Sequence, residues 1–300
     1  MSGAPHFSPR PAYRWPDGKN SAFCFSVDVD CDAPYLWVNR AEDARRTLGQ
    51  LEQRHFGLRQ GLPRILDLLD RFGVKGSFFV PGAVAEANPE LLPALLARGH
   101  EIGLHGYFHE IVAESSDEEF MAALDASLAL FRQQTGTRPA MFRSPAWEMT
   151  PGMLAELARQ GLSDSSLMGF DHPYEIAGVV EVPVQWAVDD AIFFKFSGGG
   201  TDRWSPQASG PVLESWLEEF ALLHRLGQLM VLTVHDWISG RAQRLAVLEK
   251  LLQRVTAEPG CWIATIGEVA AFHAGSENAR RHAVAASLPP AIEPRRFRPG

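Results

Sequence analysis

The chain has 300 residues, of which 46% are hydrophobic and 21% are charged, a balance typical of a protein with an ordinary water-soluble core. Its 28 basic and 36 acidic residues give a formal net charge of -8, which argues against a nucleic-acid partner because such proteins present a basic face. The sequence has no apolar run long enough to span a membrane, and its N-terminus does not resemble a secretory signal. Its three cysteines form no CxxC pattern. We therefore expect a cytoplasmic protein with no membrane contact.

Short apolar runs alternate with amphipathic helical stretches from about residue 21 onward. The runs are rich in Val, Ile and Phe and mostly do not alternate with polar residues, which is typical of strands buried on both faces. In chain order, the predicted strands are Ser21–Val27, Gly76–Val80, Glu101–Leu104, Ala140–Arg143, Leu162–Ser166, Val179–Val182, Met230–Val234 and Cys261–Thr265.

Several helices carry recognisable start signals. Two are an N-cap residue followed by proline and two are capping boxes, at Asn88-Pro89, Thr150-Pro151, Ser116 with Glu119, and Thr265 with Glu268. Leu62–Phe72 has a broad apolar face, as expected of a helix packed on a core.

The alternation of strands and helices predicts a parallel sheet with crossover helices. Seven or eight such units favour closure into a TIM-like α/β barrel, and an open doubly wound sheet is the alternative. Because both ends of the chain are rich in Pro, Arg and Ala, we expect an extended N-terminal arm over residues 1–20, a barrel over 21–273 and an extended tail over 274–300.

The chemically interesting side chains stand where predicted strands end. Asp28 and Asp30 follow the first strand, His105 the third, Arg143 the fourth and His235 the seventh. The carboxyl ends of barrel strands meet at one mouth, where barrel enzymes carry their sites. This convergence is stronger evidence than any single motif.

His105 and His109 are four residues apart, a spacing that puts both imidazoles on one face of a helical turn and lets them bind one ion. In isolation such a pair is more often two unrelated histidines. Asp28 and Asp30 point the same way in an extended segment, and adjacent carboxylates repel unless a cation or guanidinium lies between them. One aspartate can be a metal ligand and the other a base.

Arg143 and His235 complete the candidate set. Arg143 is placed to orient a carboxylate by a two-pronged contact, or to form a surface ion pair. His235 is a natural proton donor at neutral pH, or a structural histidine. Two histidines with one carboxylate leave open coordination positions, so the residues predict a catalytic divalent metal and hydrolysis of an amide or related carbonyl compound.

Four segments together resemble the polysaccharide deacetylase family, the NodB-like domain of carbohydrate esterase family four. The likeness covers about residues 13–273 and rests on Ser26–Asp30, Gly99–His109, Phe142–Pro145 and Leu232–His235. The resemblance implies a distorted barrel and a divalent metal, usually zinc, held by an aspartate and two histidines. It also implies these roles: Asp28 as base, Asp30, His105 and His109 as metal ligands, Arg143 as tether of the base, and His235 as acid.

Val29 separates the two acids that are adjacent in the usual family motif. This spacing resembles a branch with peptidoglycan-deacetylase-like proteins, cyclic imide hydrolases and metal-independent-type allantoinases, as do Asp171–Tyr174, Glu181–Trp186 and Asp189-Asp190. We take Trp147, Asp171 and Trp186 as candidates for substrate binding, and Asp164, at a strand end, as the candidate acid that orients His235.

The leading functional hypothesis is a metal-dependent hydrolase of non-peptide C–N bonds, foremost a polysaccharide or amino-sugar N-deacetylase. One alternative is ring opening of a cyclic imide or ureide, and another is a non-catalytic sugar-binding protein. We expect a small-molecule or saccharide substrate, with assembly into a homo-oligomer left open. A closed pocket would favour a small ring, whereas a long groove would favour a glycan.

Overall fold

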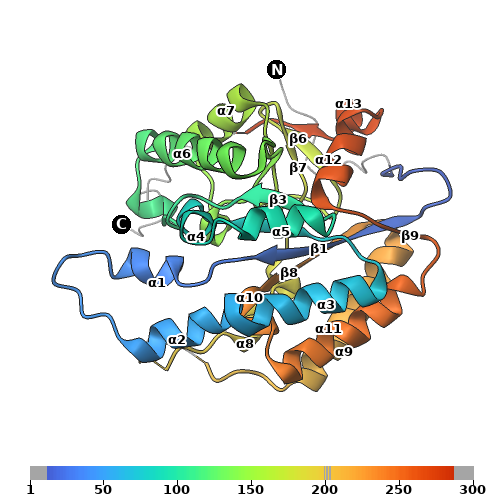
Figure 1. Cartoon of the computed structure of the whole chain (residues 1–300). Helices are drawn as coiled ribbons and strands as arrows, with labels where there is room; N and C mark the ends of the chain where they lie inside the picture. The colour runs from blue at the N-terminus through green and yellow to red at the C-terminus, as the bar shows by residue number, and fades with distance from the viewer. Residues whose placement is uncertain (1–11, 199, 201, 203, 287–300) are drawn as a thin grey trace, which may run out of the picture.

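The computed structural model describes residues 12–198, 200, 202 and 204–286, and the outer parts of the predicted arm and tail lie outside these ranges. A curled sheet forms the centre of the molecule (Figure 1). Within the described residues it has ten strands in the order β10-β6-β7-β5-β4-β3-β2-β1-β8, with β9 beside β1. The strands are β1 (Ser21–Asp28), β2 (Ser77–Val80), β3 (Glu101–Leu104), β4 (Met141–Phe142), β5 (Ser163–Asp164), β6 (Tyr174–Ile176), β7 (Val179–Glu181), β8 (Leu229–His235), β9 (Cys261–Ile263) and β10 (Ala283–Val284).

All neighbouring strands are parallel except the β6–β7 pair. No ladder joins β8 to β10 in the described part of the chain, so the sheet curls into a distorted half-barrel instead of closing fully. The predicted α/β barrel architecture is confirmed in this form. All eight predicted strands are present, and two further strands, β6 and β10, were not predicted.

The helices connect and cover the strands. In Figure 1, α3, α9 and α11 lie below β1 and β8, whereas α4 to α7 lie above. The α-helices are α1 (Ala33–Val38), α2 (Leu48–Phe56), α3 (Leu62–Phe72), α4 (Gly82–Ala87), α5 (Leu91–Ala97), α6 (Asp117–Thr135), α7 (Pro151–Gln160), α8 (Ala191–Phe194), α9 (Ser209–Leu226), α10 (Asp236–Ser239), α11 (Ala242–Thr256), α12 (Ile266–Ala274) and α13 (Asn278–Arg281). A π-helical turn, η1 (Gly57–Gly61), joins α2 to α3, and 3-10 turns are η2 (Val112–Glu114), η3 (Pro145–Trp147) and η4 (Trp186–Val188).

Three of the four predicted helix starts are confirmed. Ser116 and Thr265 form capping boxes, and the Thr150 hydroxyl accepts from the Met153 amide at the start of α7. The prediction at Asn88 is wrong. Asn88 ends α4, and its side-chain amide donates to the Val84 carbonyl, so α5 begins only at Leu91.

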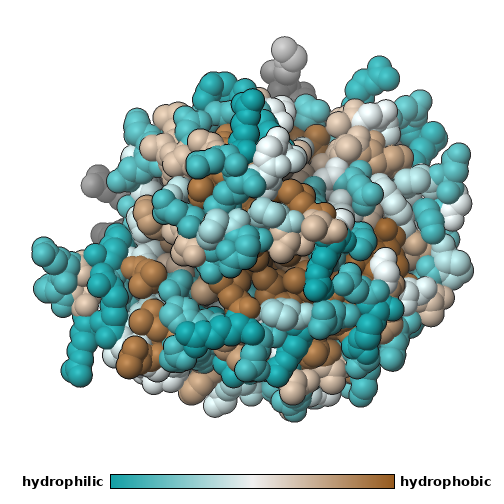
Figure 2. Space-filling model, in the orientation of Figure 1, coloured by the Kyte–Doolittle hydropathy of each residue, from teal (hydrophilic) through white to brown (hydrophobic). Residues whose placement is uncertain are grey.

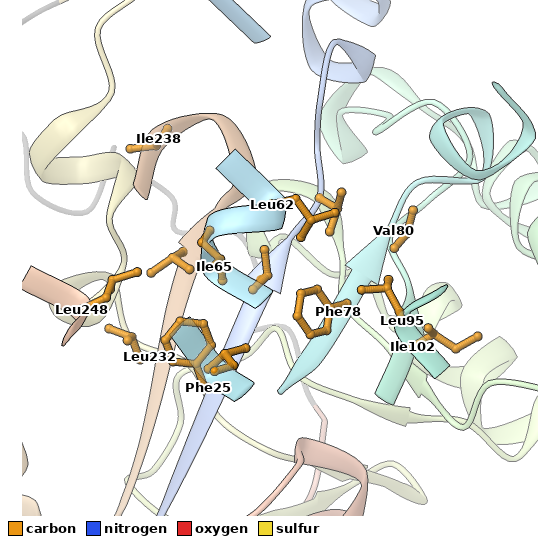
Figure 3. Close-up of a cluster of buried hydrophobic side chains, with 14 of the residues drawn as sticks. Phe25, Leu62, Ile65, Phe78, Val80, Leu95, Ile102, Leu232, Ile238 and Leu248 are labelled. Carbon is orange, nitrogen blue, oxygen red and sulfur yellow. The ribbon is translucent and has the colours of Figure 1, made fainter. Parts of the chain in front are cut away.

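Strand β1 separates two cores because its side chains alternate between its faces. Phe23, Phe25 and Val27 face the surrounding helices and belong to one hydrophobic cluster. Figure 3 shows Phe25 in this cluster with Ile65 of α3 and Phe78 of β2. Ala22 and Cys24 face the barrel interior, which α12 fills with Ile266 and Val269. Ser26 and Asp28 continue the interior face, because the period of a strand is two. Asp28 therefore lies at the carboxyl end of the barrel interior.

The described part of the N-terminal segment is fixed to the C-terminal one. Tyr13 and Trp15 are buried, the Trp15 indole donates to the Gly227 carbonyl, and the Asn278 side chain bonds the backbone of Arg14 in both directions. The predicted division into arm, barrel and tail stays a prediction.

No helix in the described residues is long and apolar enough to cross a bilayer. The face shown in Figure 2 is mainly hydrophilic, with hydrophobic side chains gathered in a recess across its middle.

Candidate metal centre

The polar residues at the strand ends meet around a cavity of about 160 Å³. The register of the β1–β8 ladder sets Asp28 level with His235, and β3 ends at the same edge of the sheet, on the far side of β2. The cavity is lined by Asp28, Asp30, Pro34, Arg54, His105, His109, Ala146, Trp147, Trp186, Asp189, Ala191, Lys195, His235, Trp237 and Ile238. The sequence therefore predicted correctly which strand ends converge.

Asp30, His105 and His109 bring three potential ligand atoms within 4.8 Å of one another. Asp30 Oδ1 lies 3.4 Å from His105 Nε2, and its Oδ2 lies 3.6 Å from His109 Nε2. Burial acts to raise the pKa of Asp30, but the neighbouring imidazoles outweigh it and lower that pKa. Burial lowers the pKa of His109 to about 4. At neutral pH, Asp30 is thus anionic and His109 neutral, the forms that bind a cation.

Two observations show that this donor set fits a divalent metal. Asp30 Oδ1 is buried and has no hydrogen-bond partner among the described residues, which is costly for a carboxylate oxygen without a cation. His105 Nδ1 lies 2.8 Å from the Arg143 carbonyl oxygen, which can only accept. Nδ1 therefore carries the proton, and Nε2 is left to bind an ion, as in most metal-binding histidines.

A loop, and not the predicted helical turn, brings His109 beside His105. Gly106 and His109 have φ of 67° and 61°, in the left-handed region, so residues 105–109 are not helical. The Glu110 carboxylate accepts hydrogen bonds from the amides of Tyr107 and Phe108 and holds the loop. The two imidazole rings end 5.0 Å apart. The four-residue spacing correctly indicated that His105 and His109 lie close together, but the helical turn inferred from that spacing is wrong.

Arg143 is completely buried and holds Asp28 by a single contact, not the predicted two-pronged one. Its Nη1 donates to Asp28 Oδ1 at 2.7 Å and to Ser26 Oγ at 2.9 Å. Its Nε and Nη2 donate to the carbonyl and hydroxyl of Ser165. Because Nε and Nη2 bond Ser165, the residue after β5, only Nη1 is left to contact the Asp28 carboxylate.

His235 is oriented by Asp190, and the prediction of Asp164 for this position is wrong. Asp190 Oδ1 lies 2.6 Å from His235 Nδ1, and its Oδ2 accepts from the His235 amide and the Ser239 hydroxyl. His235 Nε2 is left facing Asp30 Oδ2 at 3.7 Å. Burial opposes protonation of His235, but Asp190 raises its pKa well above the ordinary value. The imidazolium is therefore the favoured form.

Asp164 belongs to a different cluster. It lies at the end of β5 opposite Glu181 of β7 and accepts from the Ser166 hydroxyl. Burial and the adjacent carboxylate raise the pKa of Glu181 well above its usual range, so the pair holds a proton. Ser166 in turn accepts from the Ser144 amide, next to Arg143. This cluster supports the backbone behind Arg143 and does not reach His235.

Trp147 and Trp186 line the cavity as predicted, with ring centroids 4.2 Å apart. Trp147 is buried, whereas Trp186 is partly open to solvent. The prediction that Asp171 lies at the substrate-binding site is wrong. Its carbonyl accepts from Leu229, the first residue of β8, while the cavity lies at the other end of that strand. Its carboxylate accepts from Gln185, and it does not line the cavity.

Comparison with known proteins agrees with this geometry. A family model described as polysaccharide deacetylase matches residues 56–164. A Mycobacterium smegmatis structure named for polysaccharide deacetylases is 33% identical, with a TM-score of 0.86, over 94% of this chain and 99% of that one. The chain belongs to the polysaccharide deacetylase family.

Other relatives of this deacetylase-family chain are more distant. A Helicobacter pylori peptidoglycan deacetylase is 26% identical over 84% of the chain and 96% of that protein, and a peptidoglycan deacetylase-like protein of Gibberella zeae is 27% identical over 76% and 79%. The structure of PuuE allantoinase has a TM-score of 0.79 at 19% identity over 90% of the chain and 96% of its own, and it shows only the shared barrel.

Two residues at this deacetylase-family site carry little signal in the sequence. Asp190 follows no predicted strand, and only the likeness of Asp189-Asp190 to a family segment points to it. Arg54 lies on a polar helix, α2, and belongs to none of the motifs. Only the packing of α2 over the strand ends places Arg54 at the cavity.

Proposed function

We propose that the chain is a metal-dependent hydrolase of non-peptide amide bonds, in the first place an N-deacetylase of an amino sugar or its polymer. The observation that carries the proposal is the presence, around one cavity, of a metal-ligand set, a buried carboxylate fixed by arginine and a histidine fixed by a carboxylate. A divalent ion such as zinc, held by Asp30, His105 and His109, would polarise the amide carbonyl and acidify water.

The chain's own residues supply the proton transfers. Asp28, held in place by the hydrogen bond from Arg143 Nη1, accepts the proton of the attacking water. His235, kept protonated by Asp190, donates a proton to the departing nitrogen from its Nε2 face. An amide nitrogen leaves poorly as an anion, so this acid is required. Their different partners, Arg143 for Asp28 and Asp190 for His235, thus give the two residues opposite tasks.

Metal analysis combined with a substrate screen tests the proposal. We expect about one divalent ion per chain and acetate release from N-acetylated amino sugars or their oligomers. Asp30→Asn should lose the ion and the activity while retaining the fold by circular dichroism. A purified protein that binds no divalent ion and hydrolyses no amide would instead favour the non-catalytic, sugar-binding alternative.

Ring opening of a cyclic imide or ureide is a second candidate function, and the small volume of the cavity supports it. About 160 Å³ is small beside the roughly 300–1,000 Å³ of common ligand pockets. It suits one small ring or a single sugar unit better than a long glycan. Parallel assays on a chitin oligomer, an N-acetylated monosaccharide and a cyclic imide would rank the three by kcat/KM.

A further inference from the structure

Arg54 is a buried cation beside the proposed catalytic centre that the mechanism does not use. Its side chain lines the cavity, and the residue is 7% exposed. Its guanidinium carbon lies 5.0 Å from the Tyr35 ring centroid and 5.1 Å from that of Trp237. The two aromatic rings therefore fix the orientation of the guanidinium.

The hydrogen bonds of Arg54 occupy only one of its nitrogens. Nη1 donates to the carbonyl and side-chain oxygens of Gln50, at 3.0 and 2.7 Å. Among the described residues, Nε and Nη2 have no hydrogen-bond partner, and no carboxylate forms an ion pair with Arg54. These two nitrogens form the side edge of the planar fork, which matches a carboxylate in a two-pronged contact.

Helix α2 holds Arg54 firmly over the cavity. The side-chain amides of Gln50 and Gln53 donate to the carbonyls of Ser197 and Phe196, which tie α2 to the segment after α8. Lys195 of that segment also lines the cavity. A buried guanidinium without an ionic partner is costly, and that cost is removed when a ligand supplies the anion.

We propose that Arg54, together with Lys195 of the same cavity, binds a carboxylate carried by the substrate, so that the cavity selects anionic amides over neutral ones. The inference rests on the proposed hydrolase function, because it concerns the same cavity. The acids around the cavity do not satisfy this role: Asp28 is paired with Arg143, Asp30 belongs to the ligand set, and Asp189 accepts from the Ala191 amide.

Matched probes test the proposal by binding as well as by turnover. Suitable pairs are N-acetylmuramic acid and hydantoin-5-acetic acid, each against its own carboxamide, titrated into the metal-loaded protein and followed by tryptophan fluorescence. We expect the wild type to bind the acid of at least one pair roughly 10- to 100-fold more tightly. Arg54→Gln should bring that ratio close to one, and Arg54→Lys should leave an intermediate ratio.

Two further variants keep the test decisive. Lys195→Met changes an exposed residue, so it should fold normally and reduce the ratio. Arg59→Gln removes the same charge from the next turn, where Arg59 pairs with Glu52 outside the cavity, and should leave the ratio unchanged. Equal binding of acid and carboxamide by the wild type, or a preference that survives in Arg54→Gln, overturns the proposal. A preference for the acid without turnover of any probe contradicts the hydrolase function instead.

Discussion

At the scale of single residues, Arg143 shows how one side chain serves both the site and the fold. It is fully buried, stacks 4.1 Å from the Phe79 ring centroid and bonds strands on both sides of β4. A buried charge is tolerated only when it is paired and hydrogen-bonded, and Asp28 and Ser165 meet that condition together. Arg143 therefore couples the orientation of the proposed base to the packing of the barrel interior.

Replacing Arg143 by lysine should lower both the stability of the fold and the catalytic rate. A lysine ammonium is a point charge on a flexible stem and cannot contact Asp28 and Ser165 in the same plane. We expect the free energy of unfolding to fall by about 1–3 kcal/mol and kcat to fall roughly 100-fold or more. Urea unfolding and initial rates would measure the two effects. Ser165→Ala is the control that removes the hydroxyl contact alone, and wild-type kcat in Arg143→Lys would exclude Arg143 from the mechanism.

His235→Ala should retain metal and fold but lose roughly 10²–10⁴ in kcat, the usual contribution of a general acid. Asp190→Asn should lose less, because the imidazole remains but its protonated form is no longer favoured. A cyclic imide should tolerate both changes better than an acetamide, since its leaving nitrogen is more acidic. Rates of both variants on both substrates, with metal content as control, would check this, and undiminished rates would leave His235 structural.

At the scale of elements, the loop between β3 and η2 determines whether His109 can reach the ion. Its left-handed residues, Gly106 and His109, place the second imidazole, and Glu110 replaces the missing helical hydrogen bonds. A helical turn would have placed both rings without such support. The loop therefore makes the geometry of the centre dependent on Glu110, a residue that touches no proposed ligand atom.

Glu110→Gln should weaken metal binding about 10- to 100-fold, the typical effect of a residue that positions a ligand. The glutamine amide is uncharged and would place an NH2 donor against the Tyr107 amide, where Glu110 Oε2 now accepts. Competition with a fluorescent chelator would give the affinity. Glu114→Gln is a matched control in η2, where Glu114 pairs with Arg40 at the surface and should be neutral. Unchanged affinity in Glu110→Gln would show that the loop holds its shape without the carboxylate.

At the scale of the whole molecule, the two ends of the described chain meet over the barrel interior. Tyr13 lies against His172, His273 and His282, and its hydroxyl lies 3.1 Å from His273 Nδ1. Burial, with the neighbouring histidines, lowers the pKa of His273 to about 4. We therefore propose that the domain boundary falls before Tyr13 and that this segment stabilises the barrel, whereas the residues before it are dispensable.

This cluster predicts a loss of stability in acid. His273 has a pKa of about 4 when folded, below its ordinary value of 6.5, so the unfolded chain binds a proton that the folded chain excludes. The contribution is complete above pH 6.5 and is lost progressively as the pH falls towards 4, by at most about 3 kcal/mol. His273→Asn keeps an acceptor for the Tyr13 hydroxyl and removes the titration. Urea unfolding between pH 7.5 and 4.5 should show a smaller decline for this variant, and parallel declines would contradict the argument.

The sequence by itself determined eight of the ten described strands, three of the four helix starts predicted from it and which polar residues meet at the mouth. These follow from local patterns: buried strands are continuous apolar runs, and parallel strands must all present their carboxyl ends together. Asp28, Asp30, His105, Arg143 and His235 were found because each follows a strand directly. The family likeness then supplied their proposed roles.

Only the tertiary structure decided which side chains orient and surround those residues. Asp190 reaches His235 because its segment joins the edge of β8 through the Asp189–Thr233 bridge, and Arg54 reaches the cavity because α2 packs over the strand ends. Neither contact leaves a periodic or short-range signal, since the partners are 45 residues apart in one case and the helix is polar in the other. Long-range packing fixes such pairs, so the sequence could supply the candidate reacting groups but not the side chains that orient and surround them.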